Sequence, residues 1–93
     1  MITKDEQQRA YKCAFKRGKS KRNFKDWCVD ILSEVTELFK SHLYPSEHIP
    51  EFTEHDEELA DIVITCMSMA EYYGIDLGRV IEAKMTYNER RED

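Results

Sequence analysis

Two pairs of carboxylates occur at helical spacing in this sequence. Glu34 and Glu37 are three residues apart, and so are Glu58 and Asp61. Like charges at this spacing repel on a helix surface, and a solvated acidic flank is the ordinary interpretation of such a pair. If the two pairs face each other, four carboxylates converge, and a hard divalent cation makes that arrangement stable at neutral pH. Oxygen ligands of this kind predict Mg²⁺, with Mn²⁺ as the alternative.

The second pair opens a segment that is apolar around most of its circumference. Glu58 and Asp61 belong to a narrow polar stripe at steps of three and four, which also holds Glu54, Thr65, Ser68 and Tyr72. A helix that is apolar nearly all round is typically buried, yet a short chain has few other elements to cover it. We therefore expect a homo-oligomer, either a dimer or a tetramer.

Four helical segments are expected to position these residues, at about 4–17, 24–41, 54–73 and 77–90. Capping pairs precede the first and third segments, Asn23 and Asp76 precede the second and fourth, and Gly18 and Gly74 follow the first and third. Residues 42–53 contain both prolines and no periodicity, which indicates a loop. The predicted fold class is all-α, a single domain over residues 1–93 that forms a four-helix bundle completed by oligomerisation.

Charge is distributed unevenly along the chain, whose net charge is −5. Residues 1–25 carry nine basic and two acidic groups, whereas residues 26–93 carry five basic and seventeen acidic groups. An acidic chain of this kind is a poor candidate for binding nucleic acid. The basic segment 16–25, KRGKSKRNFK, is expected to be a solvated helix end and turn, with attraction of a phosphorylated small molecule as the alternative.

Membrane insertion and disulfide bonding are not expected. The apolar stretches are too short to span a bilayer and the first residues lack a signal-peptide pattern, so we expect a cytoplasmic protein that does not contact membranes. Cys13, Cys28 and Cys66 are odd in number and widely spaced, which argues against a disulfide framework and a zinc site. They are expected to be reduced thiols, mostly buried.

Three short motifs in this order resemble the MazG-like all-α nucleoside triphosphate pyrophosphohydrolases. They are SEVTE at 33–37, EELAD at 57–61 and KMTYNERR at 84–91, and the resemblance extends over about 24–92. The sequence departs from the family pattern at Ser33, where the first acidic motif usually begins with another glutamate. The missing glutamate would orient water or support the metal ligands. Its absence puts that role in doubt, and with it the level of activity.

The resemblance implies Mg²⁺-dependent hydrolysis of a nucleoside triphosphate between its α and β phosphates, which gives a monophosphate and pyrophosphate. Glu34, Glu37, Glu58 and Asp61 are then the expected metal-binding and catalytic residues. Lys84, Asn88 and Arg91 share one face of the last helix and are expected to bind phosphate, with a solvated helix end as the alternative. Trp27 and Tyr87 are candidates for contact with the base, although aromatic residues at core spacing more often belong to the core.

Two other functions remain open at this point. One is a catalytically silent, oligomeric helical module that binds nucleotide or metal, for which Ser33 is the main support. The other is a different reaction on the same fold, such as a hydrolysis in histidine biosynthesis or the selective cleavage of deoxyuridine triphosphate. The sequence does not define the preferred base or sugar.

Overall fold

The computed structural model describes residues 1–18 and 23–92, and within these ranges the chain forms α-helices and no β-strand. The helices are α1 (Lys4–Lys16), α2 (Phe24–Lys40), α3 (Glu54–Tyr72) and α4 (Leu77–Arg90). The predicted all-α class is confirmed, and every helix ends within one residue of its expected range. Residues 19–22 of the basic segment, where a turn is expected, lie outside the described ranges.

Capping residues define where the helices begin. Thr3 accepts a hydrogen bond from the backbone N–H of Glu6, and the Glu6 side chain accepts one from the N–H of Thr3. Asn23 with Asp26 and Thr53 with Asp56 form the same reciprocal pair. Each pair satisfies donors that a helix start otherwise leaves exposed. The helix starts are therefore fixed by local sequence.

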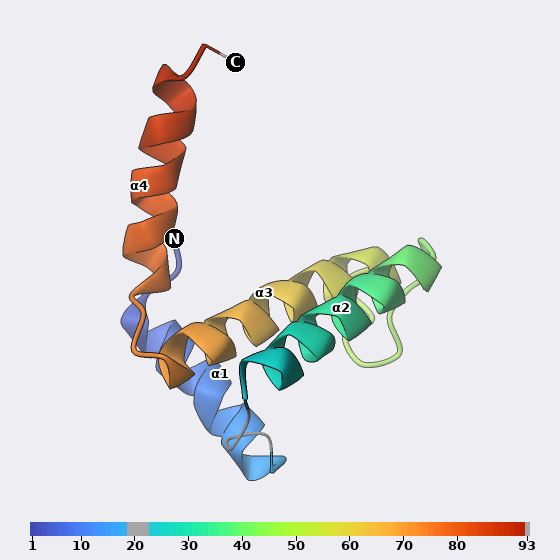
Figure 1. The fold of residues 1–93 in the computed structure, drawn as a ribbon. Helices are drawn as coiled ribbons and strands as arrows, with labels where there is room; N and C mark the ends of the chain where they lie inside the picture. Colours follow the sequence, from blue (N-terminus) through green and yellow to red (C-terminus); the bar gives the residue numbers. More distant parts are fainter. Residues whose placement is uncertain (19–22, 93) are drawn as a thin grey trace.

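The helices α1 and α2 both pack against α3. Figure 1 shows α2 lying beside α3, with α1 crossing α3 on another side. The fully buried apolar residues are few, namely Ala10, Ala14, Trp27 and Ala70. Tyr72 joins the three helices, because its ring lies 6.3 Å from that of Tyr11 and 5.6 Å from that of Trp27, centroid to centroid. The core is thus thin and lies near the C-terminal end of α3.

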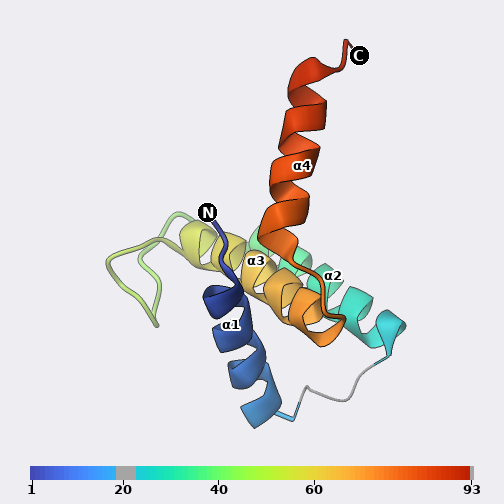
Figure 2. The same ribbon diagram turned by 90° about the vertical axis from the view of Figure 1, so that its left-hand side faces the viewer.

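The fourth helix leaves this group of helices. Figures 1 and 2 both show α4 projecting away from α2 and α3, and its contacts are mainly with α1. The buried side chain of Gln7 holds the preceding turn, since its amide donates to the Ile75 carbonyl at 2.6 Å and accepts from the Leu77 N–H at 3.2 Å. A Cβ at Gly78 would collide with the Ile2 carbonyl oxygen, so the N-terminus passes close to the start of α4. These contacts hold α4 at its N-terminal end.

Much apolar surface stays exposed in the single chain. Phe39 on α2 is 90% exposed, Leu59 on α3 is 54% exposed and Val80 on α4 is 52% exposed. The expected burial of α3 is therefore incomplete, because α1 and α2 cover only part of its circumference. The cysteines also differ from expectation: Cys13 is exposed and Cys28 and Cys66 are only partly buried. Among the described residues, no helix is both long enough and apolar enough to cross a membrane.

Candidate metal centre

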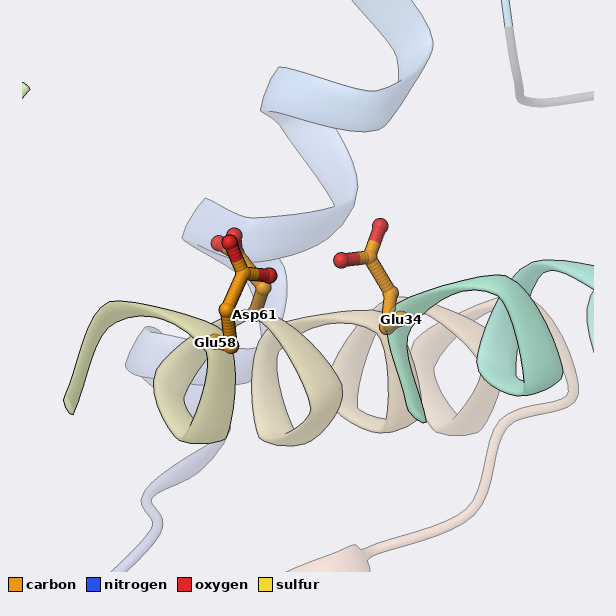
Figure 3. Close-up of side chains that lie close together, drawn as sticks. All are labelled: Glu34, Glu58 and Asp61. Carbon is orange, nitrogen blue, oxygen red and sulfur yellow. The ribbon is translucent and has the colours of Figure 1, made fainter. Parts of the chain in front are cut away.

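Three of the four predicted carboxylates come together in the structure. Glu34 of α2 and Glu58 and Asp61 of α3 each place a carboxylate oxygen so that all three lie within 4.8 Å of one another. Figure 3 shows the side chains converging from the two helices and pointing to the same side. All three are partly buried. Oxygen ligands at this separation match the donor set that Mg²⁺ and Mn²⁺ use in proteins.

The loop between α2 and α3 fixes the two helices relative to each other. Within the loop, Pro45 and Thr53 form an isolated antiparallel β-bridge, and the Ser46 N–H donates to the Phe52 carbonyl at 2.9 Å. The end of α2 is tied to the first turn of α3 by a hydrogen bond of 3.0 Å between the Ser41 hydroxyl and Nδ1 of His55. The 42–53 segment, expected as a loop, is therefore ordered by its own hydrogen bonds.

A buried serine anchors this loop to α3. Ser46 is 2% exposed, its hydroxyl donates to the Glu57 carboxylate, and it accepts from the backbone N–H groups of His48 and Ile49. The other oxygen of Glu57 lies 2.8 Å from Nδ1 of His48. Sequence analysis missed this contact, because Ser46 lies in a non-periodic loop that gives no signal of burial, and Glu57 of α3 meets it only once the loop has folded back. Glu57 directly precedes Glu58, so the loop is anchored next to one of the three converging carboxylates.

Burial and neighbouring negative charges shift the pKa values of two of the three converging carboxylates, Glu58 and Asp61. Burial, followed by the charges of Asp61 and Glu34, raises the pKa of Glu58 above its ordinary value. Burial and the charge of Glu57 raise the pKa of Asp61, and Arg17 offsets part of that rise. A raised carboxyl pKa means that the charged form is disfavoured without a counter-charge. The donor set and its charge therefore fit a divalent cation.

In the contact that anchors the loop, the pKa shifts of Glu57 and His48 favour the charged forms instead. Hydrogen bonds from Ser46 and His48 lower the pKa of Glu57, and the bond to Glu57 raises the pKa of His48. Each shift favours the charged form because the partner stabilises it. Adjacent glutamates thus have different environments: Glu57 is satisfied within the chain, whereas Glu58 faces two further carboxylates.

The remaining predicted site residues lie elsewhere. Glu37 is exposed and does not belong to the group of three, although its charge acts on Glu58. Lys84, Asn88 and Arg91 are exposed residues of α4 and its C-cap, and α4 begins from the opposite end of α3. A single chain therefore does not bring the expected phosphate-binding residues to the carboxylates.

The two aromatic candidates also differ in position. Trp27 is 1% exposed and packs against Tyr72, so it contributes to the core. Tyr87 is 56% exposed on α4, where the ammonium of Lys84 lies 4.4 Å from its ring centroid. Of these two residues, Tyr87 is the one whose side chain is exposed to solvent.

Comparison with protein families identifies a match for this chain. No curated protein and no solved structure matches the chain. The MazG-like family matches residues 27–93, which include all of α3 and α4, nearly all of α2, and the three converging carboxylates. This match spans well over half of the sequence and agrees with the resemblance carried by the three acidic and basic motifs. The chain therefore belongs to the MazG-like family.

Proposed function

We propose that this protein is a Mg²⁺-dependent nucleoside triphosphate pyrophosphohydrolase that cleaves between the α and β phosphates. The observation that carries the proposal is the convergence of Glu34, Glu58 and Asp61 within the segment that matches the family. The MazG-like family includes nucleoside triphosphate pyrophosphohydrolases. The products would be a nucleoside monophosphate, or its deoxy form, and pyrophosphate.

The chain supplies the ligands for the metal and the acid–base groups. Glu34, Glu58 and Asp61 would hold Mg²⁺, with Mn²⁺ as the alternative, and Glu37 would complete the acidic surface next to Glu58. A bound Mg²⁺ supplies positive charge that neutralises the phosphate chain and favours attack by water at phosphorus. One of these four carboxylates would act as the catalytic base. Before metal binds, the mutual repulsion of these carboxylates is the energy that cation binding relieves.

The site would be completed by a second copy of the chain. Lys84, Asn88 and Arg91, the proposed phosphate-binding residues, lie on or next to a helix that leaves its own α2 and α3. Apolar residues on α2, α3 and α4 are more than half exposed, among them Phe39, Leu59 and Val80. Joining two copies would cover these surfaces and bring α4 of one chain toward the carboxylates of the other. In such a homo-oligomer, Tyr87 would be the aromatic residue available to a base.

A silent binding module is the second candidate, and Ser33 favours it. Ser33 is exposed on α2 directly before Glu34, where the family pattern usually has a further acid. A chain without that acid would still bind a cation through Glu34, Glu58 and Asp61. This second function predicts binding of Mg²⁺ and nucleotide without turnover.

Phosphorus NMR with Mg²⁺ and a panel of ribo- and deoxyribonucleoside triphosphates separates these functions. Monophosphate together with pyrophosphate would support the proposed reaction and would also rank the bases and sugars. Diphosphate together with orthophosphate would mean a different hydrolysis. Calorimetry on the same samples tests the silent module, because binding without any product would support it and contradict the enzyme.

A further inference from the structure

Lys84 and Tyr87 are in contact on α4. The Nζ atom of Lys84 lies over the Tyr87 ring, 4.4 Å from the ring centroid, which is within the range of an attractive cation–π interaction. Both side chains are exposed to solvent. In the proposed function, Lys84 binds phosphate and Tyr87 is available to a base, and nothing yet connects the two residues.

The contact follows from the positions of the two residues on the helix. They are three residues apart, so they are neighbours on one face of α4. Long side chains of a helix lean toward its N-terminal end, which brings the Tyr87 ring back over the turn that carries Lys84. Asn88 and Arg91 follow Lys84 by four and seven residues. The ring therefore holds the ammonium on the face that carries the other proposed phosphate-binding residues.

A lysine that binds phosphate gains from such a contact. Its ammonium sits on a flexible four-carbon stem, and fixing that stem when a ligand binds costs conformational entropy. A side chain that already rests on a ring has lost part of this freedom before the ligand arrives, so less is lost on binding. The N–H groups of Lys84 that point away from the ring can still donate to phosphate oxygens.

The ammonium occupies one face of the Tyr87 ring. The opposite face can still stack on a base, so the contact with Lys84 and a contact with a base are compatible. The two roles differ in the ligands that they affect. Positioning of Lys84 affects every ligand that has a phosphate chain, whereas stacking affects only a ligand that has a base.

We propose that Tyr87 is a positioning residue that holds the ammonium of Lys84 for the phosphate chain of the substrate. The proposal rests on the proposed function for the identity of the substrate and for phosphate binding by Lys84. Tyr87 then contributes to substrate binding through Lys84, whether or not its other face also meets the base.

The test uses inorganic tripolyphosphate, a ligand that has a phosphate chain and no base. Calorimetry in Mg²⁺ would measure its binding, and steady-state kinetics would use the nucleoside triphosphate that the unchanged protein hydrolyses best. We expect Tyr87→Leu to weaken tripolyphosphate binding about 2- to 5-fold and to raise KM for the nucleotide at least as much, with a smaller change in kcat. Tyr87→Phe should retain both values of the unchanged protein, because phenylalanine keeps the ring face.

A Lys84→Gln background separates positioning from a direct contact with the ligand. If the ring acts through the ammonium, adding Tyr87→Leu to Lys84→Gln should cause no further loss of tripolyphosphate affinity. Additive losses would overturn the proposal. Unchanged tripolyphosphate binding in Tyr87→Leu, together with a raised KM for the nucleotide, would also overturn it, because Tyr87 would then meet only the base.

Met85→Ala is the matched control for lost apolar surface on α4. Met85 is 50% exposed, and it directly follows Lys84, so the two side chains point to different sides of the helix. This substitution should leave tripolyphosphate affinity and KM unchanged. Equal losses in Met85→Ala and Tyr87→Leu would overturn the positioning role, because they would show a general effect of the α4 surface.

Proton NMR distinguishes a failure of this contact from a failure of the proposed function. The ε-methylene protons of a lysine held over an aromatic ring are shifted upfield, and Tyr87→Leu should return the Lys84 signal to the position of an ordinary lysine. Absence of the upfield shift in the unchanged protein would overturn the role of Tyr87, even if the protein hydrolysed triphosphate. An unchanged protein that showed the shift but neither hydrolysed triphosphate nor bound tripolyphosphate would overturn the proposed function, and the positioning role with it.

Discussion

The two ends of α3 are connected to their neighbours in different ways. At the N-terminal end, the loop 41–53 returns the chain alongside α2, and Ser46 anchors that loop to Glu57. At the C-terminal end, Gln7 holds only a short turn, and α4 then leaves the other helices. Each connection depends on a side chain that is 2% exposed. The connection at Ser46 closes a helical hairpin of α2 and α3, whereas the connection at Gln7 directs α4 away from the other helices.

This difference separates the acidic and the basic parts of the proposed site. Glu34, Glu58 and Asp61 are held by one hairpin, so their spacing is set within a single chain. Lys84 and Asn88 lie on α4, which leaves this hairpin, so they would meet carboxylates only through the proposed second copy. A single chain thus brings together the proposed metal ligands without the proposed phosphate-binding residues of α4.

The largest effect is expected from Glu58→Gln. Removal of one of three charged ligands should lower Mg²⁺-dependent turnover by about 100-fold or more, because a neutral amide is a much weaker ligand for Mg²⁺. The metal-free protein should stay folded and become more stable, since burial and two neighbouring carboxylates disfavour the Glu58 charge. Initial rates and thermal unfolding with a chelator would measure the two effects.

Glu37→Gln is the matched control for the group of three. It changes the same residue type on the same acidic surface, but Glu37 is exposed and outside the converging group. We expect a loss of about 10-fold, in line with residues that surround metal ligands without binding the metal. A larger loss in Glu37→Gln than in Glu58→Gln would show that the hairpin does not select the ligands in the way proposed.

The next largest effect concerns α4 and uses two defective chains. Lys84→Gln should lower turnover about 10- to 100-fold if its ammonium binds phosphate. When this variant is mixed and re-equilibrated with Glu58→Gln, a dimer that shares residues across copies should regain about a quarter of the unchanged activity, because half of the mixed dimers' sites are intact. The rate of the mixture, compared with each variant alone, measures the recovery.

No recovery on mixing would contradict the contribution of a second copy. If α4 served its own chain, every site in a mixed dimer would carry one defect, and the mixture would be as slow as its parts. Size-exclusion chromatography with light scattering establishes that the two variants still associate. The experiment thus tests whether the basic half of the site is supplied from outside the hairpin.

Helix positions and the acidic pairs could be predicted from the sequence because both depend on local patterns. The capping pairs mark the helix starts, and spacing along one helix brings Glu58 and Asp61 to one face. Selection of Glu34 over Glu37 depends on the register between α2 and α3, which spacing within α2 does not contain. Four carboxylates were expected to converge, and three do.

The direction of α4 could not be predicted for a different reason. It depends on Gln7, a glutamine in a helix of polar composition, which becomes buried only when α1 packs on the α3–α4 turn. The same limit applies to Ser46, whose burial depends on how the loop folds back on α3. Both are long-range polar contacts, and neither periodicity nor capping patterns signal them.

Smaller effects are expected from removing the two buried anchors. Ser46→Ala and Gln7→Ala should each lower the free energy of unfolding by about 1–3 kcal/mol, because each leaves buried backbone groups without a partner. Only Ser46→Ala should also weaken Mg²⁺ binding, since only that anchor positions α2 against α3. Chemical denaturation and Mg²⁺ calorimetry on both variants separate stability from metal affinity.

Thr36→Ala provides the control for loss of a hydroxyl. Thr36 is exposed on α2 and its hydroxyl donates to the Leu32 carbonyl within the same helix. Its removal should change unfolding by no more than about 0.5 kcal/mol. Equal loss of Mg²⁺ affinity in Ser46→Ala and Gln7→Ala would mean that the two ends of α3 are coupled through the helix, and the contrast drawn between them would fail.

The smallest effect is the pH dependence of the metal-free protein, because the carboxylates involved are only partly buried. Glu58 and Asp61 have raised pKa values in the folded state, so the folded chain binds their protons more tightly than the unfolded chain. Their contribution therefore favours folding below the ordinary carboxyl pKa and turns unfavourable as pH rises through the raised values. Glu57 acts in the opposite sense, since its pKa is lowered and its contribution is lost as pH falls through that lowered value.

These signs give a direct comparison between neighbouring glutamates. Chelator-treated Glu58→Gln should lose part of the stability gain that the unchanged protein shows on mild acidification, whereas Glu57→Gln should be the less stable of the two at neutral pH because it breaks the anchor to Ser46. Saturating Mg²⁺ should reverse the first trend, since the cation binds the deprotonated carboxylates and stabilises the fold as pH rises. Denaturation midpoints from about pH 4 to 8, with and without Mg²⁺, measure both. If Mg²⁺ left the pH profile of the unchanged protein unaltered, the hairpin would hold its carboxylates together for a purpose other than binding this cation.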